Sequence, residues 1–307
     1  MIRAAVLFVF VSLWWCVGSA QSLLRVHFLD VGQGDAVLIQ SPAGPNVLYD
    51  GGDSPTTILR HLDALGISRL DLVVASHNHA DHIGGLAEVI TRFRPSYYLD
   101  NGLPTTTLTY RRVLAAVQAA GTELLEPTAR QIRLGEDGFI DVLPPSRVKG
   151  WDQNDNAVGL IVTYGSFRLS LAGDAEQRQW ANWIEHHTPL LGNVDVHKAS
   201  HHGSTNGDIP AALAMLAPKT VVISVGLNNN YGHPRPQMLE LYAARGSTTF
   251  RTDINGTVSV EADVSGRYTV RPQRGQGAAP RSLLTQRPEP PPPVSEKPRP
   301  GVSRDVR

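Results

Sequence analysis

Short β-rich apolar runs alternate with helical patterns, in which apolar residues recur every three or four positions, from Leu23 to about Val270. These two periodicities predict strands and amphipathic helices, respectively. The expected strands are Leu24–Leu29, Ala36–Gln40, Asn46–Tyr49, Leu70–Ala75, Phe139–Leu143, Ala157–Tyr164, Phe167–Leu171, Val194–His197, Val221–Val225 and Thr257–Glu261. The expected helices are Thr56–Leu65, Gly85–Arg94, Tyr110–Ala120, Glu176–His186, Pro210–Leu216 and Pro236–Ala244.

The order of these elements indicates the fold class. The early strands follow one another closely, with Asp30–Gly34 as one tight connection, so hairpins are expected there. The later strands are separated by helices. This mixture predicts an α/β (α+β) domain in which sheets pack face to face with helices outside, and not a doubly wound parallel sheet.

The first 20 residues have the composition of a secretory signal peptide. Arg3 precedes an apolar run, Ala4–Val17, which ends at the small residues Gly18–Ala20. The run is shorter than the ~20 residues that a membrane span requires. We expect cleavage after Ala20 and export to the periplasm or the medium, with an uncleaved N-terminal membrane anchor as the alternative. The single cysteine, Cys16, lies in this segment, so the cleaved protein has no disulfide partner.

The chain after residue 270 differs in composition from the part before it. Nine of the 22 prolines lie between Pro272 and Arg307, and such a segment buries too little apolar surface to offset its ordering entropy. Residues 271–307 carry a net charge of +5, whereas residues 21–270 carry 19 basic and 25 acidic groups, a net charge of −6. We therefore expect one folded domain, 21–270, and a Pro-rich basic disordered tail, 271–307. The tail is either a solubilising linker or a segment that contacts an anionic polymer or membrane surface.

A cluster of histidines and one aspartate follows the apolar strand that ends near Ala75. His77, His79, Asp81 and His82 fall within six residues, and Gly84 and Gly85 then allow a helix to begin. Imidazole and carboxylate groups are the ligands of Zn²⁺ and similar ions. His77 and His79 point the same way in an extended chain, and Asp81 and His82 lie past the strand end. One loop can thus supply two ligands to each of two adjacent metal ions.

Two later strand ends offer the remaining ligands. Asp174 follows the strand Phe167–Leu171 and a glycine, and its two carboxylate oxygens can bridge two cations. His201 and His202 follow the strand that begins at Val194. One of this histidine pair should complete the second metal position, and adjacency alone does not say which.

Taken together, these motifs resemble the metallo-β-lactamase superfamily of metal-dependent hydrolases, and more narrowly the soluble hydrolase domain of the bacterial competence protein ComEC. The matching stretches are Asp30–Ala36, Asp50–Gly52, His77–Gly85, Asn154–Asn156, Leu171–Asp174, Lys198–Ser204 and Asn230–Pro234. The resemblance implies an αβ/βα four-layer sandwich with a dinuclear metal site at one edge. It implies two divalent ions, with Zn²⁺ expected and Mn²⁺ as the alternative. It also implies hydrolysis of phosphodiesters or related esters.

One departure from the superfamily concerns the first metal ion. Members often supply a further histidine between the His-x-His-x-Asp-His motif and the bridging aspartate, yet this chain has no histidine from Ile83 to Gly173. Asn156 stands near where that ligand would come. An amide carbonyl is a weaker and harder ligand than imidazole, which favours Mn²⁺ at this position.

Further candidate catalytic residues lie close to these motifs. His233, on a loop bounded by glycine and proline, is expected to contact a phosphate oxygen or protonate a leaving group. Lys198 is expected either to hold phosphate or to pair with a core carboxylate. Asp81 is expected to accept a hydrogen bond from the attacking hydroxide. Asp30, Gln33 and Asp35 are expected to orient the ligating imidazoles or simply to form a turn.

Three functions fit the sequence. The first is an exported phosphodiesterase or nuclease, although the acidic domain lacks the excess of Lys and Arg that phosphate contacts need. The second is a hydrolase of another ester, such as a phosphorylcholine ester, a lactone or a β-lactam. The third is a non-catalytic polymer-binding module in which the metal only stabilises the fold.

Overall fold

A computed structural model describes residues 22–278 of the chain. The predicted signal peptide and all of the predicted tail after residue 278 lie outside this range. Among the described residues, no helix is long and apolar enough to cross a membrane. The predicted boundary at residue 270 falls inside the last strand, β15, which continues to Pro272.

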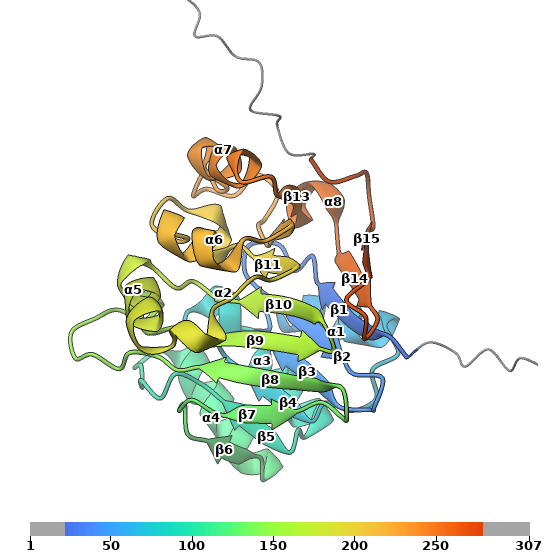
Figure 1. Ribbon diagram of the computed structural model, residues 1–307. Helices are drawn as coiled ribbons and strands as arrows, with labels where there is room; N and C mark the ends of the chain where they lie inside the picture. Colours follow the sequence, from blue (N-terminus) through green and yellow to red (C-terminus); the bar gives the residue numbers. More distant parts are fainter. Residues whose placement is uncertain (1–21, 279–307) are drawn as a thin grey trace, which may run out of the picture.

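The described chain forms two mixed sheets that pack face to face (Figure 1). One sheet has eight strands in the order β15-β14-β1-β2-β3-β4-β5-β6. These strands are β1 (Leu24–Phe28), β2 (Val37–Gln40), β3 (Asn46–Tyr49), β4 (Leu72–Val74), β5 (Tyr97–Leu99), β6 (Glu123–Leu125), β14 (Val258–Ala262) and β15 (Tyr268–Pro272). As expected for the early part of the chain, β1, β2 and β3 are joined as antiparallel neighbours.

The second sheet has seven strands in the order β13-β12-β11-β10-β9-β8-β7. These strands are β7 (Gln131–Arg133), β8 (Gly138–Leu143), β9 (Gly159–Tyr164), β10 (Phe167–Leu171), β11 (Val196–Lys198), β12 (Thr220–Ile223) and β13 (Thr248–Arg251). From β10 to β13 the neighbours are parallel, because helices return the chain between them.

Helices cover the outer face of each sheet. The helices α1 (Pro55–Ala64), α3 (Leu86–Phe93) and α4 (Leu108–Ala120) pack on the eight-stranded sheet, and α5 (Gln177–His186), α6 (Pro210–Leu216) and α7 (Pro236–Ala244) pack on the other. The short helices are α2 (Ala80–Ile83) and α8 (Thr252–Asn255), and the 3-10 turns are Asn154–Asn156, Thr188–Leu190 and Ser200–Gly203. The order of helix, sheet, sheet and helix confirms the predicted αβ/βα four-layer sandwich.

Alternation along the central strands explains this layering. In β2, Val37 and Ile39 contribute to the core between the sheets, whereas Leu38 packs under the helices. Side chains of consecutive strand residues point to opposite faces, so a continuous apolar run can serve both layers. Full burial of each such side chain stabilises the fold by roughly 1.5–3 kcal/mol.

All six predicted helices are present, with ends within two residues of the prediction. α1 begins one residue earlier than expected because Ser54 caps it, accepting a hydrogen bond from the Thr57 N–H, and because Pro55 fits the first turn. The sequence prediction missed β5, β6, β7, β13 and β15 and the short helices α2 and α8. Three of these missed strands have only three residues, too few to show a period.

Candidate metal centre

The predicted ligands meet at one edge of the sandwich. β3 and β4 are parallel neighbours in one sheet, and β10, β11 and β12 are parallel neighbours in the other. The carboxyl ends of these strands lead into Asp50, His77, Asp174, His202 and Ser224. Residues far apart in the sequence thus come together because parallel strands end at the same edge of their sheet.

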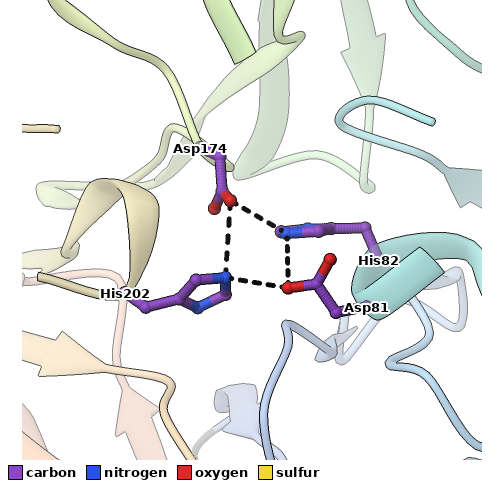
Figure 2. A group of neighbouring side chains, drawn as sticks. All are labelled: Asp81, His82, Asp174 and His202. Carbon is purple, nitrogen blue, oxygen red and sulfur yellow. Dashed lines mark ion pairs between the residues drawn. The ribbon is translucent and has the colours of Figure 1, made fainter. Parts of the chain in front are cut away.

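Four side chains form a compact group at this edge (Figure 2). His82 Nε2 lies 3.2 Å from Asp174 Oδ2 and 3.7 Å from Asp81 Oδ2. His202 Nε2 lies 3.4 Å from the same Asp174 oxygen and 3.2 Å from the same Asp81 oxygen. Four ligands at about 2.1 Å from a tetrahedral ion lie about 3.4 Å from one another. The group therefore fits a divalent ion, and we call it the second metal position.

The hydrogen bonds of the His82 and His202 imidazoles orient these rings to bind a metal ion. Nδ1 of His82 lies 2.9 Å from Asp50 Oδ2, and Nδ1 of His202 lies 2.9 Å from the carbonyl oxygen of Ser224. Both acceptors hold a proton on Nδ1, so Nε2 is the nitrogen that would present its lone pair to a metal ion. Both Nε2 atoms are buried and have no hydrogen-bond partner among residues 22–278. A metal ion would satisfy them.

The backbone explains which residue of the histidine pair enters this group. His201 and His202 have φ values of 47° and 53°, in the left-handed region that non-glycine residues seldom adopt. Two such residues in succession turn the chain sharply, and His202 points at Asp174 and Asp81. His201 is instead directed so that its Nδ1 lies 3.2 Å from Glu176 Oε1, while its Nε2 lies 3.8 Å from Asp174.

His77 and His79 lie next to this group and mark a first metal position. His77 Nε2 is 2.9 Å from His79 Nδ1 and 4.0 Å from Asp174 Oδ2. Burial, reinforced by the neighbouring His82, lowers the pKa of His77 well below its usual value, so the imidazole is neutral and able to ligate. Asp174 thus lies between the two positions, as expected for a bridging carboxylate.

The charges of the second metal position favour a cation. Burial opposes ionisation of Asp174, but His202 and His82 hold its pKa well below the usual value. Conversely, burial alone would lower the pKa of His82, yet Asp174 and Asp81 raise it well above the usual value. The carboxylates therefore hold protons on nearby imidazoles, and a divalent ion would take the place of those protons.

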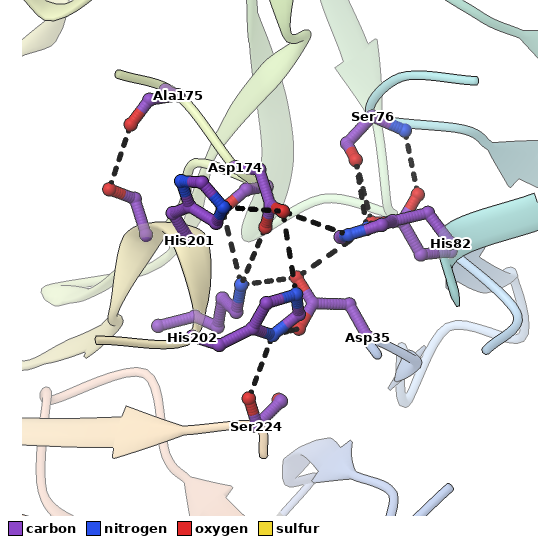
Figure 3. A network of polar contacts seen from close by, with 12 residues as sticks. Asp35, Ser76, His82, Asp174, Ala175, His201, His202 and Ser224 are labelled. Carbon is purple, nitrogen blue, oxygen red and sulfur yellow. Dashed lines mark hydrogen bonds and ion pairs between the residues drawn. The ribbon is translucent and has the colours of Figure 1, made fainter. Parts of the chain in front are cut away.

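Lys198 is fully buried behind the ligands and does not face the cavity described below. Its Nζ donates to Asp35 Oδ2 and to the carbonyl oxygen of Gly173. Asp35 in turn lies between His202 and His82, 3.4 Å from Nδ1 of the former and 3.8 Å from Nδ1 of the latter (Figure 3). Of the two roles predicted for Lys198, the structure supports pairing with a core carboxylate, so Lys198 is a positioning residue rather than a phosphate ligand.

The turn before Asp174 depends on a glycine. Gly173 has φ of 52°, and a Cβ atom there would lie 2.5 Å from the Cβ of Ser76. Its carbonyl oxygen accepts hydrogen bonds from Lys198 Nζ and from the His201 N–H. A side chain at this position would push the β4 loop away from the β10 loop and separate the two halves of the centre.

A cavity of about 300 Å³ opens in front of the ligands. Its lining residues are Gln33, His79, Ala80, Asp81, Asn154, Asp174, His201, His202, Tyr231 and His233. His233 is thus at the site, as predicted. Burial, together with His201 and His202, lowers its pKa to about 4, so the ring is neutral at pH 7. In that state it can donate or accept a hydrogen bond, but it holds no proton to transfer as an acid.

Two predicted roles receive no support from the geometry. The side chain of Asn156 is buried and bonded at both ends to backbone: its Oδ1 accepts from the Val148 N–H and its Nδ2 donates to the Asp152 carbonyl. It therefore has no group free for a metal. Asp30 pairs with Arg274 and does not line the cavity.

Sequence reasoning missed Asp50 as a functional residue. Asp50 is fully buried, and besides His82 it accepts hydrogen bonds from the N–H and the hydroxyl of Ser76. Its signal was present in the sequence, since it is a carboxylate at the end of a strand followed by two glycines. That pattern equally predicts an ordinary turn.

Comparison with known proteins agrees with this geometry. The chain is similar to ComE operon protein 3 of Bacillus subtilis (strain 168), with 27% identity over 255 residues, covering 76% of this chain and 32% of that protein. It is also similar to competence protein ComA of Neisseria gonorrhoeae, with 29% identity over 252 residues, covering 80% of this chain and 33% of that protein. The chain thus spans about a third of the length of these relatives. They confirm the predicted resemblance to ComEC.

Among solved structures, CmlA, a diiron β-hydroxylase from Streptomyces venezuelae, matches with a TM-score of 0.50 and 15% identity, over 78% of this chain and 54% of that one. This likeness shows a shared fold. The sequence profile of the metallo-beta-lactamase superfamily matches residues 29–226, which include His77, Asp174 and His202. With that match over more than half of its length and a metal-ligand group at the expected sheet edge, this chain belongs to the metallo-beta-lactamase superfamily.

Proposed function

We propose that this protein is an exported hydrolase that cleaves phosphodiester bonds at a dinuclear metal centre. The observation that carries the proposal is the group formed by Asp81, His82, Asp174 and His202, which opens into the cavity of about 300 Å³. Structural zinc sites are closed by protein ligands, whereas catalytic sites keep a position for water or substrate. Four protein side chains surround the second metal position, but the cavity beside them leaves room for water or substrate as an additional ligand, and catalytic zinc can expand to five ligands. This favours catalysis over a purely stabilising metal.

Divalent ions bound here would lower the pKa of water and place positive charge beside a phosphoryl oxygen. The side chains of the protein would orient the attacking water and the substrate. Asp81 directs Oδ2 toward His202 and His82, and its side chain remains one-third exposed toward the cavity. Its other oxygen is therefore free to accept a hydrogen bond from the attacking water and orient it. Burial opposes ionisation of Asp81, but His82 and His202 outweigh it and lower the pKa of this carboxyl far below its usual value. Asp81 therefore stays ionised in this role.

His233 and Tyr231 line the cavity together. Their rings stack with centroids 5.9 Å apart and an interplanar angle of 24°. The neutral His233 ring can donate a hydrogen bond to a phosphate oxygen, and the exposed Tyr231 ring offers a flat apolar face to the group attached to it. A phosphodiester carrying a planar substituent fits this part of the cavity.

The names of the relatives support a nucleic acid as the natural phosphodiester. They include competence protein ComA and recombination protein 2 of Haemophilus influenzae, the latter 26% identical over 243 residues, covering 77% of this chain and 28% of that protein. The net charge of +5 in residues 271–307 would help an acidic domain to approach an anionic polymer or a membrane surface. Export rests on residues 1–20, and mass measurement of the mature protein would show cleavage after Ala20.

Hydrolysis of bis-(p-nitrophenyl) phosphate, with Zn²⁺ and Mn²⁺ supplied in turn, tests the proposal. The wild-type chain is expected to turn over, and the variants His77→Ala and Asp174→Ala are expected to fall to the buffer background. Unchanged turnover in both variants would refute the proposed centre.

A substrate panel separates the alternatives. Single-stranded DNA, a phosphorylcholine ester and nitrocefin represent a nucleic acid, another phosphoester and a β-lactam. Cleavage of nitrocefin or the choline ester without cleavage of DNA would favour a different ester hydrolase. Tight metal binding without turnover of any of them would favour a polymer-binding module.

A further inference from the structure

Only three residues of the sequence motifs can contribute ligands to the first metal position. His77 and His79 each offer one nitrogen, and Asp174 offers an oxygen 4.0 Å from His77 Nε2. These are three donors, the number that a catalytic zinc site takes from protein. An octahedral ion such as Mn²⁺ takes six ligands and prefers oxygen, so the position can accept a further protein oxygen. The chain has no histidine between Ile83 and Gly173, where the superfamily often supplies a further ligand, so a protein ligand from that stretch must be of another type.

Asn154 presents an unused oxygen in the wall of the cavity that His79 and Asp174 also line. The residue is only 8% exposed, and its Oδ1 has no hydrogen-bond partner among residues 22–278. A buried amide oxygen without a partner costs about 1–3 kcal/mol, so a native structure rarely leaves one without a reason. The 3-10 turn Asn154–Asn156 is what brings this side chain to the cavity wall.

Glu176 fixes which way the amide of Asn154 faces. Asn154 Nδ2 donates to Glu176 Oε1 at 3.0 Å. An ionised carboxylate only accepts hydrogen bonds, so the NH₂ group must face Glu176 and the carbonyl oxygen must occupy the other branch of the amide.

We propose that Asn154 Oδ1 is the remaining protein ligand of the first metal position and that Glu176 holds it in place. This inference rests on the metal centre of the proposed function, and it assigns the role to Asn154 instead of Asn156. The first position would then have two imidazole nitrogens, one carboxylate oxygen and one neutral carbonyl oxygen. The second has two imidazoles and two carboxylates.

The two positions would consequently differ in metal preference. A neutral carbonyl contributes less charge than a carboxylate and is a harder ligand than imidazole, so the first position binds more weakly and accepts Mn²⁺ more readily. At limiting metal the second position fills first. Full occupancy of the first position requires a higher free-metal concentration.

Metal content and Mn²⁺ titration of the full chain test the assignment. Wild type is expected to bind two ions per chain and to show, by electron paramagnetic resonance, the coupled signal of a Mn²⁺ pair. Asn154→Ala is expected to bind one ion tightly and to lose the coupled signal. Its affinity for the second equivalent should fall by at least about 10- to 100-fold, the loss usually seen when even an outer partner of a ligand is removed.

Two further variants sharpen the comparison. Glu176→Ala frees the amide to rotate and should weaken the second equivalent by about 10- to 100-fold while keeping the oxygen donor. Asn156→Ala is the matched control, because it removes two backbone hydrogen bonds and should lower the melting temperature without changing the metal content. If Asn156→Ala fails to fold, Asp195→Asn replaces it as the control, because Asp195 is a buried carboxylate outside the centre that accepts from the Arg168 N–H.

The outcomes separate the two proposals. Two ions in Asn154→Ala with wild-type affinity, or only one ion in wild type, would overturn the assignment of Asn154. Loss of one ion in Asn154→Ala from a wild-type protein that cleaves no diester would uphold the assignment and reject the proposed function. Wild type that binds no divalent ion would reject both.

Discussion

Replacement of Asp50 by asparagine is expected to change which nitrogen of His82 carries a proton. Asp50 Oδ1 accepts from the Ser76 backbone N–H at 2.7 Å, and Oδ2 accepts from the Ser76 hydroxyl and lies 2.9 Å from His82 Nδ1. In Asp50→Asn, the backbone N–H requires an acceptor, so the carbonyl oxygen takes the Oδ1 place and the NH₂ group takes the Oδ2 place. The amide then donates to His82 Nδ1, and the imidazole proton moves to Nε2.

The expected magnitude follows from this change of tautomer. His82 Nε2 is the atom that lies 3.2 Å from Asp174 Oδ2 in the second metal position, and a protonated Nε2 cannot ligate. Binding then requires the unfavourable tautomer, with two donors facing each other at a fully buried site. Loss of such an outer partner typically weakens metal binding by about 10- to 100-fold, which is about 1.4–2.8 kcal/mol.

Competition between the protein and a chromogenic chelator for Zn²⁺ measures this loss. Asp195→Asn is the matched control, because Asp195 is also a buried carboxylate that accepts from a backbone N–H, that of Arg168, and lies outside the centre. The control should keep the wild-type Zn²⁺ affinity. Wild-type affinity in Asp50→Asn, or an equal loss in both variants, would refute the tautomer argument.

Three further predictions concern stability. Lys198→Met should cost about 3–5 kcal/mol in urea unfolding, because it leaves the Asp35 carboxylate buried without its cation; a stable variant with a raised KM for a diester would instead mean that Lys198 holds phosphate. Chelation of the metal should lower the melting temperature, because an ion present at about 1,000 times its Kd contributes about 4 kcal/mol to stability. Calorimetric scans with and without EDTA measure this change, and identical scans would contradict a bound ion. Burial opposes ionisation of Asp208, but contact with His197 outweighs it and lowers the pKa of Asp208 from 3.8. The ionised carboxylate therefore stabilises the fold above about pH 4. The stability lost in Asp208→Asn should consequently shrink as the pH falls below that value.

The sequence predicted the centre where local geometry determines it. His77, His79, Asp81 and His82 follow one strand, and the period of two and the turn after it were enough to place them. Asp174 could be placed because a glycine turn after a strand delivers a carboxylate to the sheet edge. The fold class followed from the order of hairpins and helices, together with the resemblance to a known family.

Other parts depended on backbone angles or on distant contacts. The choice between His201 and His202 rests on two successive left-handed residues, which no local pattern predicts. The difference between Asn154 and Asn156 rests on one 3-10 turn, in which side chains two positions apart face different surroundings. The burial of Lys198 against Asp35 joins residues on different sheets.

The ligands of the second metal position come from both halves of the sandwich, with Asp81 and His82 after β4 and with Asp174 and His202 after β10 and β11. During synthesis, the first half emerges from the ribosome with an incomplete set of donors. An ion captured at that stage would exchange freely, and firm retention would begin only after His202 has emerged and the second sheet has docked. Metal retention would thus begin late in folding, and it would indicate that the two sheets have packed together in the correct register.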